Sequence, residues 1–352
     1  MSLSNEQLRA LTIVERCASS LSILGVATII GTFSFSRHFR NPIQRIIFIN
    51  AFYNLFDFIA TMISLDGPDS GNGSALCQFQ AFSLQMFPLA DVFWTLATAW
   101  NVFLVVFYQY DAAALRMLEK KYIGAITTLV FIPAVTFLFI HTPERGPMYS
   151  SVTVWCSISP DWVLFRILFY YGPIWLTIFA IMILYTLIGL EIIKLKGKFK
   201  LISNDRIPLG STYNNSFDKP NSNVATKTVK VNAKSEPQDT EQFSINNTPA
   251  FQSHPSNSIT LKLPKQSPIS FRHYILMPLI FFIVLLATWI PLTVNRVYAF
   301  VDPGYLSYPL LVAVGAMGSL RGFWNGILFV TMGMKGWKKQ KRLERGTFTI
   351  GM

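Results

Sequence analysis

The sequence predicts an all-α membrane protein, a bundle of seven transmembrane helices with the N-terminus outside the cell and the C-terminus in the cytoplasm. Of its 352 residues, 51% are hydrophobic and only 14% are charged, and the mean hydropathy is +0.39. An ordinary soluble domain is less apolar than this. The alternation of basic and non-basic connections along the chain then indicates the orientation.

Seven stretches reach the length of about 20 mostly apolar residues that a transmembrane helix needs. Two of them, from Tyr122 to Ile140 and from Tyr274 to Asn295, contain no charged residue. The third and fifth stretches are longer than a bilayer requires, so we expect them to tilt or to extend into the cytoplasm. The predicted spans are residues 17–35, 46–65, 77–108, 123–141, 162–193, 274–300 and 306–332.

Lys and Arg in the connections indicate which side faces the cytoplasm, because basic short loops stay inside. Connections 36–45 and 109–121 and the tail are basic, whereas connections 66–76 and 301–305 contain no Lys or Arg. The formal net charge of +12 therefore reflects topology and contact with anionic inner-leaflet lipids, not binding of nucleic acid.

The long connection before the sixth helix is rich in Ser, Asn, Pro, Thr and Lys, and has no sustained periodicity. We expect it to be disordered. Its basic start, residues 194–200, fits either a G-protein docking surface or a simple lipid anchor. Trp337 and Leu343 flank a basic run in the tail, which predicts a short amphipathic helix on the inner membrane face. The predicted regions are an extracellular N-terminus (1–16), helices one to five (17–193), a cytoplasmic loop (194–273), helices six and seven (274–332) and a basic cytoplasmic tail (333–352).

Two cysteines, Cys77 and Cys156, fall on the outer side of this topology, where a disulfide can form. Such a bond would hold the second outer loop over the mouth of the bundle; the alternative is two unpaired thiols. Asn72 begins an N-glycosylation sequon in an outer connection, so a second type of signal agrees with the orientation. The sequons at Asn214 and Asn246 lie in the predicted cytoplasmic loop and should stay unmodified.

Ionisable residues inside the membrane are costly and often functional. Asp57 lies about 18 Å from the cytoplasmic end of its helix at 1.5 Å per residue, and Arg321 lies at a similar depth in helix seven. We therefore predict an ion pair between them, with Asp91 and Asn325 nearby. The pair serves either structure alone or a signalling switch. One face of helix two carries a polar stripe of Asn50, Asn54, Asp57, Thr61 and Ser64.

Three further features have both a functional and a structural interpretation. Pro291, with Trp289 before it, predicts an activation hinge in helix six, although both residues are common in membrane helices. Arg166 and Arg296 lie at the outer mouth, where they either bind an anionic or polyhydroxylated ligand or extend toward lipid headgroups. A row of glycines in helix seven predicts close approach of a neighbouring helix: Gly315, Gly318, Gly322 and Gly326.

Several runs resemble the cAMP-receptor-like receptors of slime moulds and fungi. Trp289-Ile290-Pro291-Leu292-Thr293-Val294-Asn295-Arg296 looks like their helix six, and Ser319-Leu320-Arg321-Gly322-Phe323-Trp324-Asn325 is similar to their helix seven. Glu119-Lys120-Lys121-Tyr122 resembles the start of their helix four, and Trp94 with Asn101 resembles their helix three. The resemblance spans helices two to seven, without the long inner loop.

The resemblance implies a plasma-membrane receptor that senses a small extracellular molecule and activates a heterotrimeric G protein, with fungal relatives linked to nutrient and cAMP signalling. The sequence departs from the family in two places: Arg321 stands where the family usually has Gln, and helix four lacks the expected Trp. The identity of the ligand is therefore not carried over. The Asp-Arg-Tyr triplet of rhodopsin-like receptors is also absent after Asn101, which argues against that class.

The main alternative is a seven-helix transporter of small solutes such as sugars, although the chain shows none of the internal repeats that such transporters have. A retinal protein is disfavoured because no Lys lies between Lys265 and Lys335 to form a Schiff base. The sequence contains no constellation for catalysis, metal binding or a cofactor, so we expect no enzyme.

Overall fold

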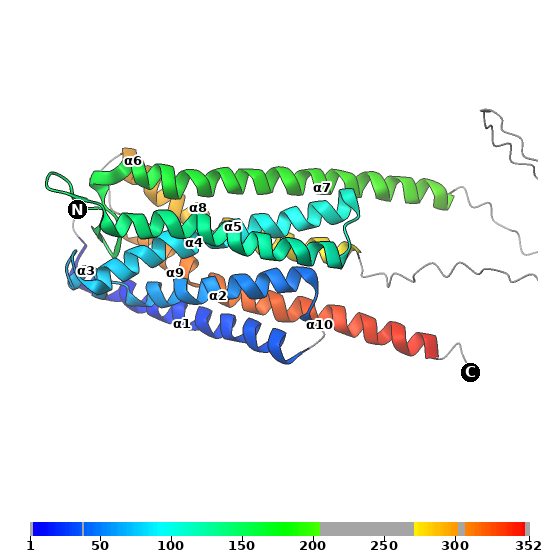
Figure 1. The fold of residues 1–352 in the computed structure, drawn as a ribbon. Coiled ribbons are helices and arrows are strands. Elements are labelled where there is room, and N and C mark those ends of the chain that lie inside the picture. The colour runs from blue at the N-terminus through cyan, green and yellow to red at the C-terminus, as the bar shows by residue number, and fades with distance from the viewer. Residues whose placement is uncertain (1–2, 37–38, 205–270, 302–306, 349–352) are drawn as a thin grey trace, which may run out of the picture. The chain divides into compact units, whose positions relative to one another are not determined.

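The computed structural model describes residues 3–36, 39–204, 271–301 and 307–348 (Figure 1). One compact unit comprises Met1–Lys198 with Pro268–Met352, and all of the following concerns this unit. Most of the predicted cytoplasmic loop 194–273, with the sequons at Asn214 and Asn246, lies outside the described residues.

Helices make up almost all of the described chain, as predicted. By length and composition, six of them suit a membrane span. The seventh predicted helix is divided, which leaves an apolar part of 12 residues and a longer part with a charged end. The helices are α1 (Asn5–Phe35), α2 (Pro42–Ile63), α3 (Asp66–Asp69), α4 (Ala75–Tyr108), α5 (Ala112–Phe139), α6 (Val163–Arg166), α7 (Gly172–Asn204), α8 (Phe271–Val301), α9 (Tyr308–Ser319) and α10 (Arg321–Phe348).

The first helix starts twelve residues earlier than the predicted residue 17, because the chain carries a capping box at its start. The Ser4 hydroxyl accepts from the backbone N–H of Gln7 (3.2 Å), and the Gln7 side chain accepts from the backbone N–H of Ser4 (3.0 Å). Most of the predicted N-terminal segment 1–16 is therefore helical. This extension brings Glu15 into α1 and into the bundle, where it is only 1% exposed.

The fifth and seventh predicted helices are less regular than the sequence suggested. Predicted helix five consists of a 3-10 turn, η2 (Pro160–Trp162), then α6, a π-helical turn η3 (Ile167–Tyr171), and α7. Predicted helix seven is divided into α9 and α10 at Leu320, and α10 then continues through the predicted separate tail helix to Phe348. The side chains after Met334 lie outside the described part, so the amphipathic face predicted there is not described.

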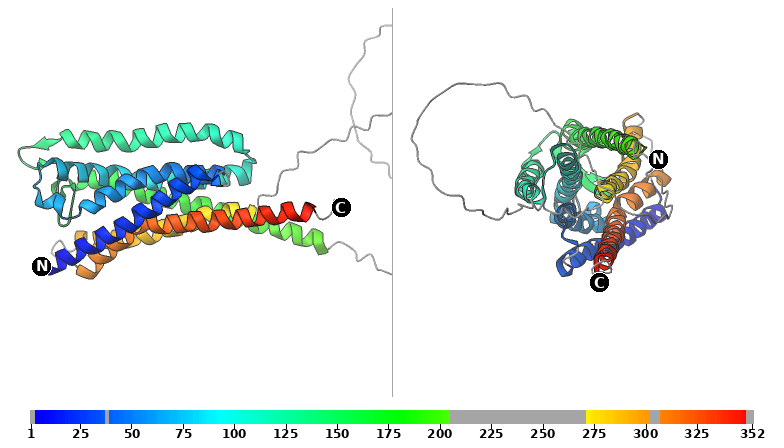
Figure 2. Two further views of the ribbon diagram at one scale, coloured as in Figure 1. Left: turned by 90° about the horizontal axis from the view of Figure 1, so that it is seen from below. Right: turned by 90° about the vertical axis from the view of Figure 1, so that its right-hand side faces the viewer.

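Helices α1 and α10 pack against each other; they are the blue helix and the orange-to-red helix in Figure 2. A Cβ atom added to Gly25 would lie 2.4 Å from the carbonyl oxygen of Gly322, and one added to Gly326 would lie 2.8 Å from the Cα of Gly25. Part of the glycine row in helix seven therefore faces a glycine of helix one, which permits this close approach.

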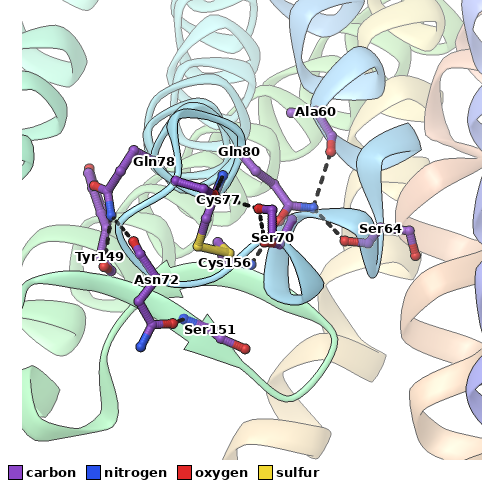
Figure 3. The surroundings of a disulfide bond; sticks show 12 residues. Ala60, Ser64, Ser70, Asn72, Cys77, Gln78, Gln80, Tyr149, Ser151 and Cys156 are labelled. Carbon is purple, nitrogen blue, oxygen red and sulfur yellow. Dashed lines mark hydrogen bonds between the residues drawn. A yellow bond between two sulfur atoms is a disulfide. The ribbon is translucent and has the colours of Figure 1, made fainter.

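The outer connection 142–161 forms two small antiparallel hairpins, which the sequence did not predict. Strand β1 (His141–Thr142) pairs with β2 (Gly146–Pro147), and β3 (Tyr149–Val152) pairs with β4 (Trp155–Ile158). The predicted disulfide between Cys77 and Cys156 is confirmed, and it joins β4 to the first turn of α4 (Figure 3).

Gln80, one turn further along α4, reinforces this attachment. Its side chain donates to the carbonyl oxygen of Ser64 (3.0 Å) and accepts from the backbone N–H of Cys156 (2.9 Å), as Figure 3 shows. The side chain is fully buried and so links the end of α2, the start of α4 and β4. Tyr149 of β3 is also fully buried and donates its hydroxyl to the carbonyl oxygen of Ala134 (3.0 Å). Burial raises the pKa of this hydroxyl, because the charged form would lose its hydration.

The tip of the β3–β4 hairpin reaches across the bundle. Val154 is fully buried in a cluster with Leu11 of α1 and Leu311 of α9. The disulfide therefore holds one end of the hairpin at α4, and apolar packing holds the other at α1 and α9. Together these contacts place β4 over the end of the helical bundle.

Candidate functional site

Three buried charges from three helices meet inside the bundle. Arg321, at the first position of α10, hydrogen bonds through Nη2 to Asp57 Oδ2 of α2 and lies 3.4 Å through Nη1 from Asp91 Oδ2 of α4. All three residues are at most 4% exposed. The structure thus brings together the two residues predicted to pair and the third residue predicted to lie near them.

Asparagines of α2 hold Asp91 from the other side. Asn50 Nδ2 and Asn54 Nδ2 donate to Asp91 Oδ1 over 2.6 and 2.9 Å. With charged acceptors, such hydrogen bonds are stronger than neutral ones. Two asparagines of the polar stripe predicted for helix two therefore orient one of the two carboxylates.

The break between α9 and α10 positions Arg321. A residue of α1 forms hydrogen bonds with the backbone groups that this break leaves without helical partners. Ser22 of α1 donates its hydroxyl to the carbonyl oxygen of Ser319 and accepts from the backbone N–H of Phe323 (3.1 Å). These are backbone groups at the end of α9 and the start of α10. A Cβ added to the intervening Gly322 would lie 2.4 Å from the ring of Phe58, so glycine is needed to bring Arg321 beside Asp57.

A cavity of about 150 Å³ lies on one side of this cluster. Asp57 and Arg321 border it, and so do Trp155 and Ser157 of the outer hairpin, which places the cavity between the charged cluster and the disulfide end. Most of the exposed surface of its wall is apolar or aromatic, and charged and polar side chains interrupt it, which is the usual character of a small-molecule site.

The π-helical turn η3 contributes two tyrosines, Tyr170 and Tyr171, to the wall of this cavity. Gln85 of α4 also borders the cavity, and its side chain donates to the carbonyl oxygen of Phe169 in this turn (3.0 Å). Short π-helical turns often occur at functional sites, because they change which side chains a helix directs inward.

Glu15 is a residue of the cavity wall that the sequence prediction missed. It accepts a hydrogen bond from the Ser64 hydroxyl (2.5 Å) at the end of the polar stripe of helix two. The signal was present, because Glu15, Ser19 and Ser22 recur at helical spacing on one buried face. The sequence prediction places the segment before residue 17 in an extracellular tail and therefore leaves Glu15 outside the bundle.

The other predicted ligand and hinge residues have different positions. Arg166 borders the cavity and is 9% exposed, whereas the side chain of Arg296 lies outside the described part. Trp289 is buried and borders the cavity, and Pro291 lies within the continuous helix α8. The structure thus brings Arg166 and Trp289 to one cavity, while the motion predicted at Pro291 stays a prediction.

A smaller cavity of about 30 Å³ lies on the other side of the charged cluster. Arg321, Asp91, Asn50 and the predicted Asn325 border it. The predicted polar cluster therefore separates two cavities: the larger one toward the disulfide, and the smaller one toward the opposite end of the bundle.

The end of the bundle opposite the disulfide carries two polar contacts between helices that the sequence prediction missed. Arg45 Nη2 of α2 pairs with Glu119 Oε2 of α5 over 2.7 Å, and the Tyr122 hydroxyl donates to Asn101 Oδ1 of α4 over 2.9 Å. Glu119, Tyr122 and Asn101 belong to the motifs that carried the family resemblance. Their contacts join α2, α4 and α5.

The glycosylation sequon at Asn72 lies in the connection beside the disulfide (Figure 3). Asn72 is exposed, and its Oδ1 accepts from the backbone N–H of Ser151 (2.9 Å). This bond leaves Nδ2, the atom to which a glycan is attached, outside the contact. Glycosylation itself stays a prediction.

Comparison with known structures supports the predicted fold class. Squid rhodopsin superposes with a TM-score of 0.60 over 99% of this chain and 89% of its own, at 12% sequence identity. At this identity the likeness concerns the fold alone. With the six long apolar helices and the divided seventh, it confirms the predicted seven-helix bundle of a multi-pass membrane protein.

Comparison of sequences identifies the family. Cyclic AMP receptor 4 of Dictyostelium discoideum is 30% identical over 156 residues, which is 43% of this chain and 33% of that protein. The chain thus aligns with about a third of the length of this curated relative. The pattern that defines the slime mold cyclic AMP receptor family matches residues 2–204, more than half of the chain. The chain therefore belongs to the slime mold cyclic AMP receptor family.

Proposed function

We propose that this protein is a G-protein-coupled receptor that binds a small extracellular molecule in the larger cavity and activates a heterotrimeric G protein on the cytoplasmic side. The observation that carries the proposal is the position of this cavity directly against the Asp57–Arg321–Asp91 cluster. A ligand in the cavity contacts the charged cluster that joins α2, α4 and α10. It is a receptor and not an enzyme.

Two features at opposite ends of the bundle support the proposed orientation. The disulfide and the sequon at Asn72 suit the extracellular side, and the basic connections 36–45 and 109–121 suit the cytoplasm, where anionic lipids attract them. In this orientation the larger cavity lies in the extracellular half, and the Arg45–Glu119 pair lies near the cytoplasm.

Ligand binding would act by shifting the equilibrium between two packings of the helices. A ligand against Trp289 presses on α8 two residues before Pro291, so a shift of α7 and α8 about Pro291 would expose an inner groove for Gα. Such a ligand must bind the active packing more tightly, since equal affinity for both would shift nothing.

Cyclic AMP is the first ligand to test, because it appears in the name of the family and of the relative. Arg166 borders the cavity and offers a guanidinium to a phosphate or a polyhydroxylated group. Arg321 in place of the family's usual Gln changes the inner wall of the cavity, so other sugars and nucleotides belong in the same test.

The experiment is guanine-nucleotide exchange on candidate Gα subunits by the purified, reconstituted protein. Cyclic AMP, other cyclic nucleotides and sugars are added one at a time, and an R166Q variant is the comparison. Exchange that rises with a ligand supports the proposal, and loss of that response in R166Q supports contact through Arg166. Flux of a sugar across the liposome membrane without exchange on any Gα would instead identify the small-solute transporter.

A further inference from the structure

Glu15 is a buried carboxylate on the cavity wall that forms no ion pair with any of the described residues. It is 1% exposed, and none of the ion pairs among the described residues includes it. Its neighbour Arg16 instead pairs with Asp66 at the exposed rim (2.6 Å). An uncompensated carboxylate in a low-dielectric site is costly, which favours the arrival of a positive charge.

The surroundings of Glu15 fix its carboxylate at the cavity. Ser64 donates to Oε2, which leaves Oε1 on the other side of the group. A Cβ added to Gly315 of α9 would lie 2.9 Å from Oε1, so any larger residue at this position would displace the carboxylate. Ser64 at the end of α2 and Gly315 of α9 thus enclose the Glu15 carboxylate from both sides.

Aromatic side chains line the same cavity. Trp155 of β4 borders it together with Glu15 and interacts with that carboxylate. Tyr170 and Trp289 lie with their ring centroids 6.1 Å apart and form another part of the wall. Aromatic faces attract organic cations and also pack against aromatic ligands. Carboxylate and aromatic rings together form a chemically consistent site for an amine.

We infer that the cavity takes a ligand with a cationic amine on an aromatic body, the amine lying against Glu15 and the aromatic body against the rings of Tyr170 and Trp289. This inference rests on the proposed function, because that function makes the cavity the ligand site. The amine neutralises Glu15, and the rest of the ligand remains within reach of Arg166 on the same wall.

The test measures stabilisation of the purified protein by three probe amines: tyramine, phenethylamine and tryptamine. Each is compared with its neutral counterpart without the amino group: 4-ethylphenol, ethylbenzene and 3-ethylindole. We expect at least one amine to raise the melting temperature more than its counterpart does. Equal effects within all three pairs would overturn the inference, and this comparison needs no variant.

Glu15→Gln then locates the amine, since it removes the charge and keeps a hydrogen-bonding group for Ser64. We expect it to weaken the affinity for the stabilising amine about tenfold or more, because a charge-assisted contact is lost. Glu6→Gln is the matched control, because Glu6 is an exposed acid on the same helix. Unchanged amine affinity in Glu15→Gln would contradict the assignment.

The two proposals fail in different ways. If no amine stabilises the protein but another ligand drives exchange on Gα, the receptor stands and the amine site is withdrawn. If an amine binds through Glu15 but no ligand produces exchange on any Gα, the amine site stands and G-protein coupling is withdrawn.

Discussion

The buried cluster of Asp57, Asp91 and Arg321 gives the sharpest prediction, a ranking of single substitutions. Arg321→Gln should destabilise most, because it leaves two carboxylates buried without a counter-charge. Asp57→Asn should be intermediate, since Arg321 loses the negative charge of its hydrogen-bonded partner but keeps Asp91. Asp91→Asn should cost least, because the direct pair between Asp57 and Arg321 remains.

The structure sets the scale of these effects. At the 3.4 Å between Arg321 Nη1 and Asp91 Oδ2, an effective dielectric constant of about 20 gives a gross attraction of about 5 kcal/mol. Desolvation offsets much of it, and removing one partner of a buried pair typically costs about 3–5 kcal/mol. We expect Arg321→Gln to fall in or above that range. The exposed pair of Arg16 and Asp66, with side chains 41% and 62% exposed, should contribute under about 1 kcal/mol, so Arg16→Gln is the control.

The assay is thermal unfolding of purified protein in detergent, together with the amount of protein at the cell surface. Exchanging the two charges in D57R/R321D should recover much of what either single reversal loses. If the exchanged variant is no more stable than the single reversals, or if Arg16→Gln destabilises as strongly as Arg321→Gln, the reasoning from burial and pairing is refuted.

Three further predictions concern other parts of the bundle. Gly326→Val should lower the melting temperature by several degrees, because the valine side chain would overlap the backbone of α1. Gly124→Val should have little effect, because Gly124 has open space around it. Equal melting temperatures of the two variants would argue against backbone contact of α1 and α10. Cys77→Ser should reduce surface expression and thermal stability, and Cys17→Ser should not, because only the first removes the disulfide; a similar loss in both would indicate a general sensitivity to cysteine replacement. Asn72→Gln should abolish a glycosidase-sensitive shift in gel mobility, and an unchanged shift would place the glycan elsewhere or the sequon on the other side of the membrane.

Much of the candidate site can be predicted from the sequence, because the chemistry of individual residues and their depth along each helix limit the possible partners. A charge within an apolar span must find a partner, and equal depth left Asp57 and Arg321 as the natural pair. Oxidising conditions outside the cell made Cys77 and Cys156 natural partners as well. The role of the charged pair, whether structural or switching, is not decided by its presence and stays a prediction.

The start of the first helix shows where the sequence prediction failed for a local reason. Apolar length alone placed the start at residue 17, although Ser4 and Gln7 carry the signature of a capping box. Extending the helix to Asn5 puts Glu15 on the same buried face as Ser19 and Ser22. Because the sequence prediction does not use the capping box of Ser4 and Gln7, it leaves Glu15 outside the cavity wall.

The number of spans, the disulfide and the depth of the buried charges can be predicted from the amino-acid sequence, because they depend on hydropathy, oxidation chemistry and the rise of a helix. The faces that meet between helices cannot be predicted in this way. Gly25 lies against Gly322 and Gly326, and Ser22 forms hydrogen bonds with the backbone groups on both sides of Leu320. These contacts form because α1 and α10 meet at these positions. Periodicity tells which side of a helix faces inward, but the neighbour that it meets depends on the crossing angles and on the packing of all helices together.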